Sequence, residues 1–106
     1  MAHRLVVQYG QPTDPAAFDR HYRDVHTGLA QAIPGLQRFT KGHAQSLDPS
    51  TPGPYLVVEL DFESAEAMGA AMSSEAGRAA GADVGTFATG GATMVSFDVD
   101  EISLAG

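Results

Sequence analysis

Residues 14–35 read DPAAFDRHYRDVHTGLAQAIPG and carry the signals of one helix, from its start to its stop. Asp14 can accept hydrogen bonds from the free amides of the first turn, and Pro15 suits the first helical position. Pro34-Gly35 cannot continue a helix, so we expect it to end at about residue 31 or 32. One apolar stripe recurs at helical spacing and consists of Phe18, Tyr22, Val25 and Leu29.

Four segments around this helix have the β-branched and aromatic composition of strands, and they cover residues 3–9, 36–44, 55–62 and 92–99. Ser64 can cap a second helix over about residues 65–72. A short helical piece follows from Ser73-Ser-Glu75, weakened by Gly77, Gly81 and Gly85. The order β-α-β-β-α-β predicts an α+β ferredoxin-like fold, in which two helices pack on one face of a four-stranded antiparallel sheet. No linker or repeat divides residues 1–106, so we expect a single domain.

The predicted strands are apolar on both faces, although two helices can cover only one. Apolar residues occupy both parities of the first and last strands, as in Leu5-Val6-Val7 and Met94-Val95. An uncovered apolar face needs a partner, and the simplest is an identical sheet related by a two-fold axis. We therefore expect a homodimer whose two sheets form a barrel-like core, with residues 100–106 ordered against the partner. The alternative is a monomer in which the tail or the long loop covers this face.

The composition argues against several classes of protein. The chain has no cysteine, which excludes disulfides, thiolate metal sites and a cysteine nucleophile. Thirteen acidic and six basic residues give a net charge of −7, so no nucleic-acid partner is expected. No stretch approaches the roughly 18 apolar residues that cross a bilayer, and the first residues lack the features of a signal peptide. We expect no membrane partner and a cytoplasmic protein.

Two neighbouring motifs resemble the EthD-like branch of the dimeric α/β barrel proteins, namely Phe18-Asp-Arg-His-Tyr-Arg-Asp-Val-His26-Thr-Gly-Leu29 and Ile33-Pro34-Gly35-Leu36. The strand from Tyr55 and the helix with Ser73-Ser-Glu75 are similar to the second half of that family. The resemblance implies a ferredoxin-like protomer and a homodimer that acts on a small hydrophobic or aromatic molecule without a cofactor. Relatives include isomerases, cyclases and cofactor-free oxygenases, and the namesakes accompany a cytochrome P450 system that degrades fuel ethers. Gly28 departs from the pattern, because proline often stands there.

His26 and Tyr22 are the candidate catalytic residues. With Phe18 as origin and about 100° per residue, Tyr22 lies near 40° and His26 near 80°, on the shoulder of the apolar stripe. A half-buried histidine beside an apolar cavity can act as a general acid or base, and a phenol can bind a ligand oxygen. The alternatives are a boundary histidine that orders the helix end and a tyrosine that only packs.

A metal site is not predicted. Five residues along a helix rotate by about 140°, so the rings of His21 and His26 are expected to diverge, whereas helical metal pairs use a spacing of four. His21 is expected to have a structural role or an interface contact.

Four further residues are predicted to line the ligand pocket. They are His43, Phe18, Phe39 and Glu59. His43 shares strand parity with Phe39, and the alternative for His43 is an exposed edge. Glu59 shares the face of Tyr55 and Val57, and it is either a pocket carboxylate paired with a histidine or a solvated or structurally paired acid.

Two functions fit this pattern. The first is a cofactor-free enzyme of isomerase, cyclase or oxygenase type, which acts on a small hydrophobic or aromatic molecule through histidine acid–base chemistry. The second is a non-catalytic binding or accessory protein that holds a small apolar ligand for an oxygenase or a degradation pathway. The same pocket serves both, so the dependence of turnover on His26 distinguishes them.

Overall fold

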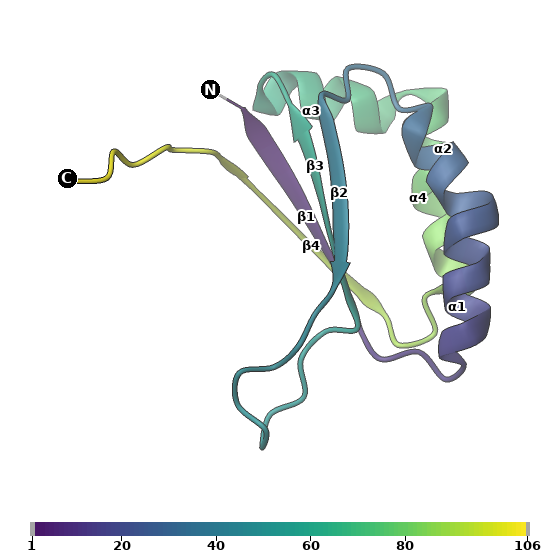
Figure 1. Cartoon of the computed structure of the whole chain (residues 1–106). Coiled ribbons are helices and arrows are strands. Elements are labelled where there is room, and N and C mark those ends of the chain that lie inside the picture. The colour runs from purple at the N-terminus through teal and green to yellow at the C-terminus, as the bar shows by residue number, and fades with distance from the viewer. Residues whose placement is uncertain (1, 106) are drawn as a thin grey trace.

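The computed structural model describes residues 2–105, which form a layer of strands and a layer of helices (Figure 1). The elements in chain order are β1 (His3–Tyr9), α1 (Pro15–His21), the π-helical turn η1 (Tyr22–His26), α2 (Thr27–Gln31), β2 (Arg38–His43), β3 (Leu56–Phe62), α3 (Ala65–Ser73), α4 (Glu75–Phe87) and β4 (Ala92–Asp98). The strands are antiparallel in the order β2-β3-β1-β4, and the helices lie on one face of the sheet. The predicted α+β ferredoxin-like fold is therefore confirmed.

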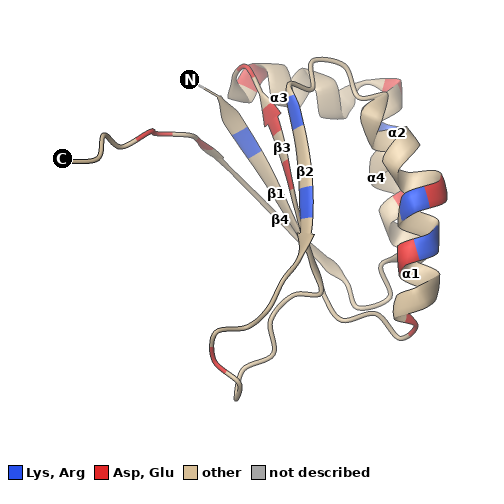
Figure 2. Cartoon of the chain, in the orientation of Figure 1, with Lys and Arg blue, Asp and Glu red and all other residues tan. Residues whose placement is uncertain are grey.

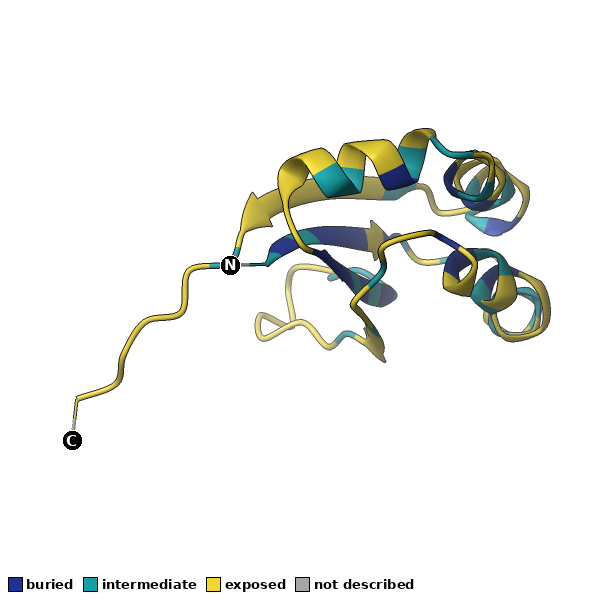
Figure 3. Cartoon of the chain, turned by 90° about the horizontal axis from the view of Figure 1, so that it is seen from above, coloured by how far each residue is buried: buried dark blue, intermediate teal, exposed yellow. Residues whose placement is uncertain are grey.

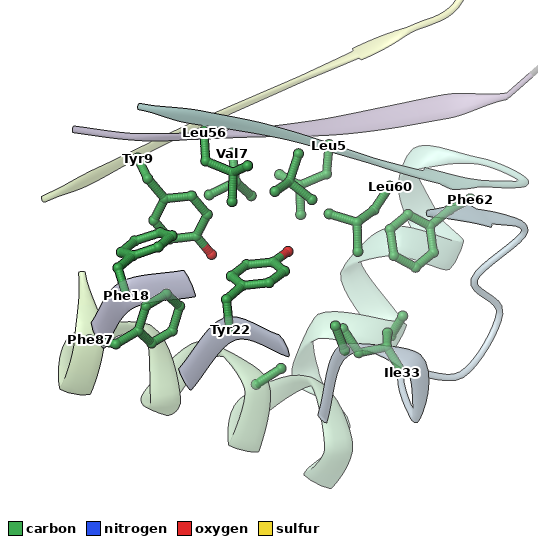
Figure 4. Packing of buried hydrophobic residues seen from close by; sticks show 14 residues of the cluster. Leu5, Val7, Tyr9, Phe18, Tyr22, Ile33, Leu56, Leu60, Phe62 and Phe87 are labelled. Carbon is green, nitrogen blue, oxygen red and sulfur yellow. The ribbon is translucent and has the colours of Figure 1, made fainter. Parts of the chain in front are cut away.

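The core lies between the two central strands and the helices. On the inner face, Leu5, Val7 and Tyr9 of β1 pair with Leu60, Val58 and Leu56 of β3 and point toward the helices (Figure 4). The Tyr9 ring is surrounded by Phe18, Tyr22 and Phe87, at centroid distances of 5.3, 6.0 and 5.6 Å. These aromatic contacts join α1, η1 and α4 to the sheet and fix the distance between the layers.

The first helix starts as predicted and runs without a break to Gln31, but it contains a π turn. The Asp14 carboxylate accepts from the Ala17 amide at 3.1 Å and caps the start. At η1 the amide of Thr27 donates to the carbonyl of Tyr22, five residues earlier, and Thr27 Oγ1 donates to the same carbonyl at 2.8 Å. Such a turn holds an extra residue and shifts the register of everything after it.

This shift changes which residues face the core. Val25 is 44% exposed, whereas the buried residues of the helix are Phe18, Tyr22, His26 and Ala30. In a regular helix each residue four positions on is rotated by about 40° around the axis, and the wider π turn reduces this rotation. Residues spaced by four therefore stay on one face here. The predicted stripe is wrong at Val25, and His26 lies on the buried face instead of on its shoulder.

α4 is longer than the short helical piece predicted from its glycines. Its 13 residues begin just after Ser74, whose hydroxyl accepts from the amide of Gly77 at 3.1 Å. A Cβ at Gly77 would collide with the Ala71 carbonyl, so the tight junction of α3 and α4 requires glycine there. Burial of Ala80 and Phe87 stabilises the helix and outweighs the low helix propensity of glycine.

β3 begins one residue later than predicted, and Tyr55 does not share the face of Val57 and Glu59. Tyr55 precedes the regular ladder, which starts with the pair Tyr9–Leu56. Its ring packs on Phe18 of α1 at a centroid distance of 5.2 Å. The strand alternation therefore does not extend to Tyr55.

The second face of the sheet carries no helix within residues 2–105. Its apolar side chains, which we call the outer patch, are Val6, Val57, Val95 and Phe97. Val95 and Phe97 are 58% and 47% exposed, and Figure 3 shows β4 exposed along its length. Charges of both signs accompany the patch on the neighbouring strands (Figure 2), where Arg4 donates to Asp61 at 2.7 Å. The face is therefore mixed, with its most exposed apolar side chains on the edge strand.

The chain after β4 leaves the body of the protein. The Val99 amide still donates to the carbonyl of Ala2 at 2.8 Å, and the following residues extend away from the sheet (Figure 1). Ile102 and Leu104 are exposed there. In the part of the chain that the structure describes, no helix combines the length and apolar character needed to cross a membrane.

Candidate functional site

A small cavity of ≈ 40 Å³ lies between the inner face of the sheet and the helices. Its wall is apolar except for Tyr9, Tyr22 and His26. Met94 of the edge strand β4 also lines it and is 48% exposed, so this side of the cavity is close to solvent. The structure thus brings together both candidate catalytic residues, and it places the predicted ligand residue Phe39 beside them.

His26 is buried and held by a carboxylate from α4. Its Nδ1 lies 2.9 Å from Asp83 Oδ2. An ionised carboxylate only accepts, so Nδ1 carries the proton and Nε2 keeps its lone pair. Burial lowers the pKa of His26 below its ordinary value of 6.5, although Asp83 partly opposes the shift. His26 is therefore neutral at pH 7 and offers a basic nitrogen to the cavity.

Asp83 is itself fixed by several donors. His21 Nε2 lies 3.0 Å from each of its carboxylate oxygens, and Thr86 Oγ1 lies 3.1 Å from Oδ1. Burial alone would raise the pKa of Asp83, but the hydrogen bonds from His26, His21 and Thr86 outweigh it and hold this pKa below 3.8. Asp83 stays ionised at neutral pH and keeps His26 in one tautomer and one orientation.

The rings of His21 and His26 meet at Asp83, so the prediction that they diverge is wrong. That prediction used the rotation of a regular helix, whereas the π turn spreads five residues over about one full turn. His21 also stacks on Phe87 at a centroid distance of 5.0 Å. Within residues 2–105 no group of three or more histidine or acidic side chains is placed to hold a metal ion.

Acidification should destabilise the protein through His26. The pKa of His26 in the folded protein lies below the 6.5 of the unfolded chain, so the unfolded state takes up this proton first. We expect the free energy of unfolding to fall as the pH drops through 6.5 and on to the folded-state pKa. The stabilisation from ionised Asp83 is complete above 3.8 and is lost only as the pH falls from there through its lower folded-state pKa.

Urea unfolding at a series of pH values between about 5 and 7.5 measures this slope. His26→Gln keeps a donor for Asp83 but does not titrate, and it should flatten the slope. His43→Gln removes an exposed histidine and serves as the control. An equally steep slope in His26→Gln would show that His26 is not the group responsible.

Two predicted ligand residues, His43 and Phe18, lie in a neighbouring hollow of ≈ 210 Å³ that shares Tyr22 with the cavity. In this hollow Asp19 accepts from the Tyr55 hydroxyl at 2.8 Å, and His43 Nε2 lies 3.4 Å from the same carboxylate oxygen. His43 does face inward with Phe39, as its strand parity indicates. The structure therefore places these residues next to the cavity but not in its wall.

Glu59 lies on the outer face of the sheet, in register with Val6 and Thr40. Side chains alternate along β3, so Val58 and Leu60 take the inner positions that line the cavity. The predicted pairing of Glu59 with a histidine in the pocket is not made, because the sheet lies between them.

Two residues of the site, Tyr9 and Asp83, were not predicted from the sequence. Tyr9 continues the inward row of Leu5 and Val7, and this parity was the available signal. Asp83 stands among small residues of α4, and only the packing of α4 against η1 brings it to His26. No local pattern indicates that contact.

The sequence matches the EthD domain family model over residues 10–91. An uncharacterised 11.0 kDa protein from the thcB–thcC intergenic region of Rhodococcus erythropolis is 43% identical over 100 residues, which cover 94% of this chain and 97% of that protein. The crystal structure of an EthD family protein from Bacillus halodurans superposes with a TM-score of 0.86 at 31% identity, over 94% of this chain and 100% of that chain.

More distant structures share the fold alone. SnoaB, a cofactor-independent oxygenase from Streptomyces nogalater, superposes with a TM-score of 0.66 at 14% identity, over 95% of each chain. Several other neighbours are described as dimeric proteins with a ferredoxin-like fold. Because the family model matches most of the chain and a structure of that family shares its fold over nearly the full length, this protein belongs to the EthD family.

Proposed function

We propose that the cavity binds a small, largely apolar molecule that carries a carbonyl or phenol oxygen, and that His26 acts there as a general base. The observation that carries this proposal is the fixed tautomer of a buried, neutral histidine beside an apolar cavity. Nδ1 donates to Asp83, so the lone pair of Nε2 remains for a ligand proton. This arrangement suits removal of a weakly acidic proton from a C–H or O–H group.

The proposed step transfers one proton. Nε2 of His26 takes a proton from the carbon next to a carbonyl group, and the electron pair of the C–H bond moves into an enolate. The positive charge on the imidazolium is stabilised by the carboxylate of Asp83, 2.9 Å from Nδ1. Return of the proton to another atom gives an isomer. Attack of the enolate on a second carbonyl of the same molecule closes a ring, and the alkoxide that forms takes the proton back from His26. Neither outcome requires a cofactor.

The cavity is narrow and has flexible parts in its wall. A volume of ≈ 40 Å³ holds a few water molecules. Met72 and Met94 line it, and methionine side chains change rotamer easily. Because Met94 is partly exposed, we propose that a ring-sized ligand enters past β4 and displaces these two side chains.

We further propose that the protein is a homodimer joined through the outer patch. Val95 and Phe97 expose apolar surface on a face that no helix covers within residues 2–105, and such a patch is unfavourable in water. Structures with this fold that are described as dimeric support the two-chain state, and the exposed patch supports the choice of face.

Deuterium exchange tests the base directly, without knowledge of the natural substrate. A small enolisable ketone, 2-indanone, is incubated with the protein in D₂O, and loss of the α-proton signal is followed by NMR. We expect saturable exchange that is faster than in buffer at the same pH. Binding without any acceleration would indicate a carrier of apolar ligands, and the absence of both would reject the proposed pocket chemistry.

A further inference from the structure

Tyr9 and Tyr22 each place a hydroxyl in the cavity without a protein partner. Both residues are 2% exposed and line the cavity, and Figure 4 shows both hydroxyls pointing into the space between sheet and helices. Neither hydroxyl makes a hydrogen bond with any group of residues 2–105. Neither oxygen is fully enclosed by protein atoms, so a molecule in the cavity can reach both. The contrast is Tyr55, whose hydroxyl donates to both oxygens of Asp19.

Unpartnered phenols are unusual in a buried layer. A buried tyrosine hydroxyl normally has a hydrogen-bond partner, because leaving it without one loses the bond it makes with water. A phenylalanine would fill the same space and pack against the same rings without this penalty. An acceptor inside the cavity completes both hydroxyls, a water molecule while the site is empty and a ligand oxygen when it is filled.

The two phenols and the base adjoin one another. The rings of Tyr9 and Tyr22 are nearly perpendicular, at 86°, with centroids 6.0 Å apart. The ring of His26 follows at a centroid distance of 5.1 Å from Tyr22. Tyr9 comes from β1, whereas Tyr22 and His26 come from the two ends of η1. A small molecule in this cavity can contact all three polar groups.

Both phenols are neutral donors over the whole physiological range. Burial raises the pKa of Tyr9 to about 12, with a further contribution from the charge of Asp83. Burial and the proximity of Tyr9 raise the pKa of Tyr22 as well. Neither phenol can serve as the base at neutral pH. Tyr9 and Tyr22 therefore donate hydrogen bonds, and His26 accepts the proton.

We propose that the hydroxyls of Tyr9 and Tyr22 donate together to one ligand oxygen, the carbonyl oxygen that becomes an enolate oxygen when His26 takes the neighbouring proton. The proposal rests on the function proposed above and narrows the ligand class to small ketones, β-dicarbonyl compounds and their enol or phenol forms with an apolar body. The C–H bond breaks toward Nε2 of His26, and the negative charge that forms on oxygen is stabilised by the two phenols.

Infrared spectroscopy of 2-indanone labelled with ¹³C at the carbonyl group, bound to the protein, reads out these donors. In the wild-type protein we expect the carbonyl stretch to move to lower frequency than in an apolar solvent. Tyr9→Phe and Tyr22→Phe should each move it back toward the apolar-solvent value, and each should slow exchange by about tenfold. Tyr55→Phe, the matched control, should change neither quantity. Each Tyr→Phe variant keeps its ring, and thermal unfolding checks that the fold is retained.

The same measurements separate the two proposals. His26→Gln should abolish the accelerated exchange and leave the carbonyl stretch where it is in the wild type. If exchange depends on His26 but the stretch is the same in wild type, Tyr9→Phe and Tyr22→Phe, the oxygen site proposed here is rejected and the proposed function stands. If 2-indanone binds with a shifted carbonyl but exchange is independent of His26, the proposed base is rejected and the oxygen site stands. A wild-type protein that does not bind 2-indanone rejects both.

Discussion

His26→Gln should lower the accelerated deuterium exchange by about 10²- to 10⁴-fold, the range over which a positioned general base contributes. Glutamine is similar in size to histidine, is compatible with a helix and can donate its amide N–H to Asp83. It has no group that accepts a proton near neutral pH. The loss should therefore appear in the exchange rate and not in ligand affinity. His43→Gln, at an exposed histidine of β2, is the control and should exchange at the wild-type rate.

Asp83→Asn should reproduce much of this loss although Asp83 does not line the cavity. An amide can present its NH₂ group to Nδ1, which would leave the proton of His26 on Nε2, the nitrogen that must be free. The carboxylate also opposes the lowering of the His26 pKa, so its removal makes His26 a weaker base. Nitrogen-15 NMR of the imidazole distinguishes the two tautomers. Wild-type exchange in Asp83→Asn would mean that the carboxylate does not position the base.

The fall of the exchange rate at low pH, its acid limb, tests the His26–Asp83 pair independently. Because burial lowers the pKa of His26 below 6.5, the midpoint of the acid limb should lie below pH 6.5. The charge that Asp83 adds is what keeps this pKa from falling further. A midpoint at or above pH 6.5 would contradict the buried His26 as the base.

The fold was predictable because its signals are local. Asp14-Pro15 starts the first helix, Pro34-Gly35 ends it, and the strand segments show their β-branched and aromatic composition directly. The helix boundaries that were predicted wrongly depend on tertiary packing. α4 is stabilised by contacts of Ala80 and Phe87 that outweigh the propensity of its glycines.

The site was less predictable, since it depends on one wide turn. The spacing of a regular helix predicts Val25 in the core and His26 on its shoulder. The four-residue spacing of the buried residues Phe18, Tyr22, His26 and Ala30 was present in the sequence and is the pattern that a π turn accommodates. Asp83 could not be found this way, because its contact with His26 joins residues 57 positions apart.

Val95→Asp should convert the proposed homodimer to a monomer. Val95 stands on β4 opposite Val6 in the outer patch and is more than half exposed in the single chain, so the substitution should cost the fold itself little. In a two-fold interface the carboxylate is buried twice, once from each copy. At about 2 kcal/mol for each unpaired buried charge, the dimer should lose about 4 kcal/mol, or about 10³-fold in dissociation constant.

Sedimentation equilibrium reads out this change as a mass near one chain, 11.0 kDa, in place of two. Leu47→Asp is the matched control, because it replaces an exposed apolar side chain that lies in the 46–54 loop and not on the sheet. It adds the same charge to a chain that already carries −7, so any general repulsion between copies acts equally in both variants. A dimer that survives Val95→Asp as well as Leu47→Asp would place its interface elsewhere. A wild-type monomer would instead favour the alternative in which the chain itself covers the outer patch, either with its tail, where Ile102 and Leu104 are exposed, or with the 46–54 loop.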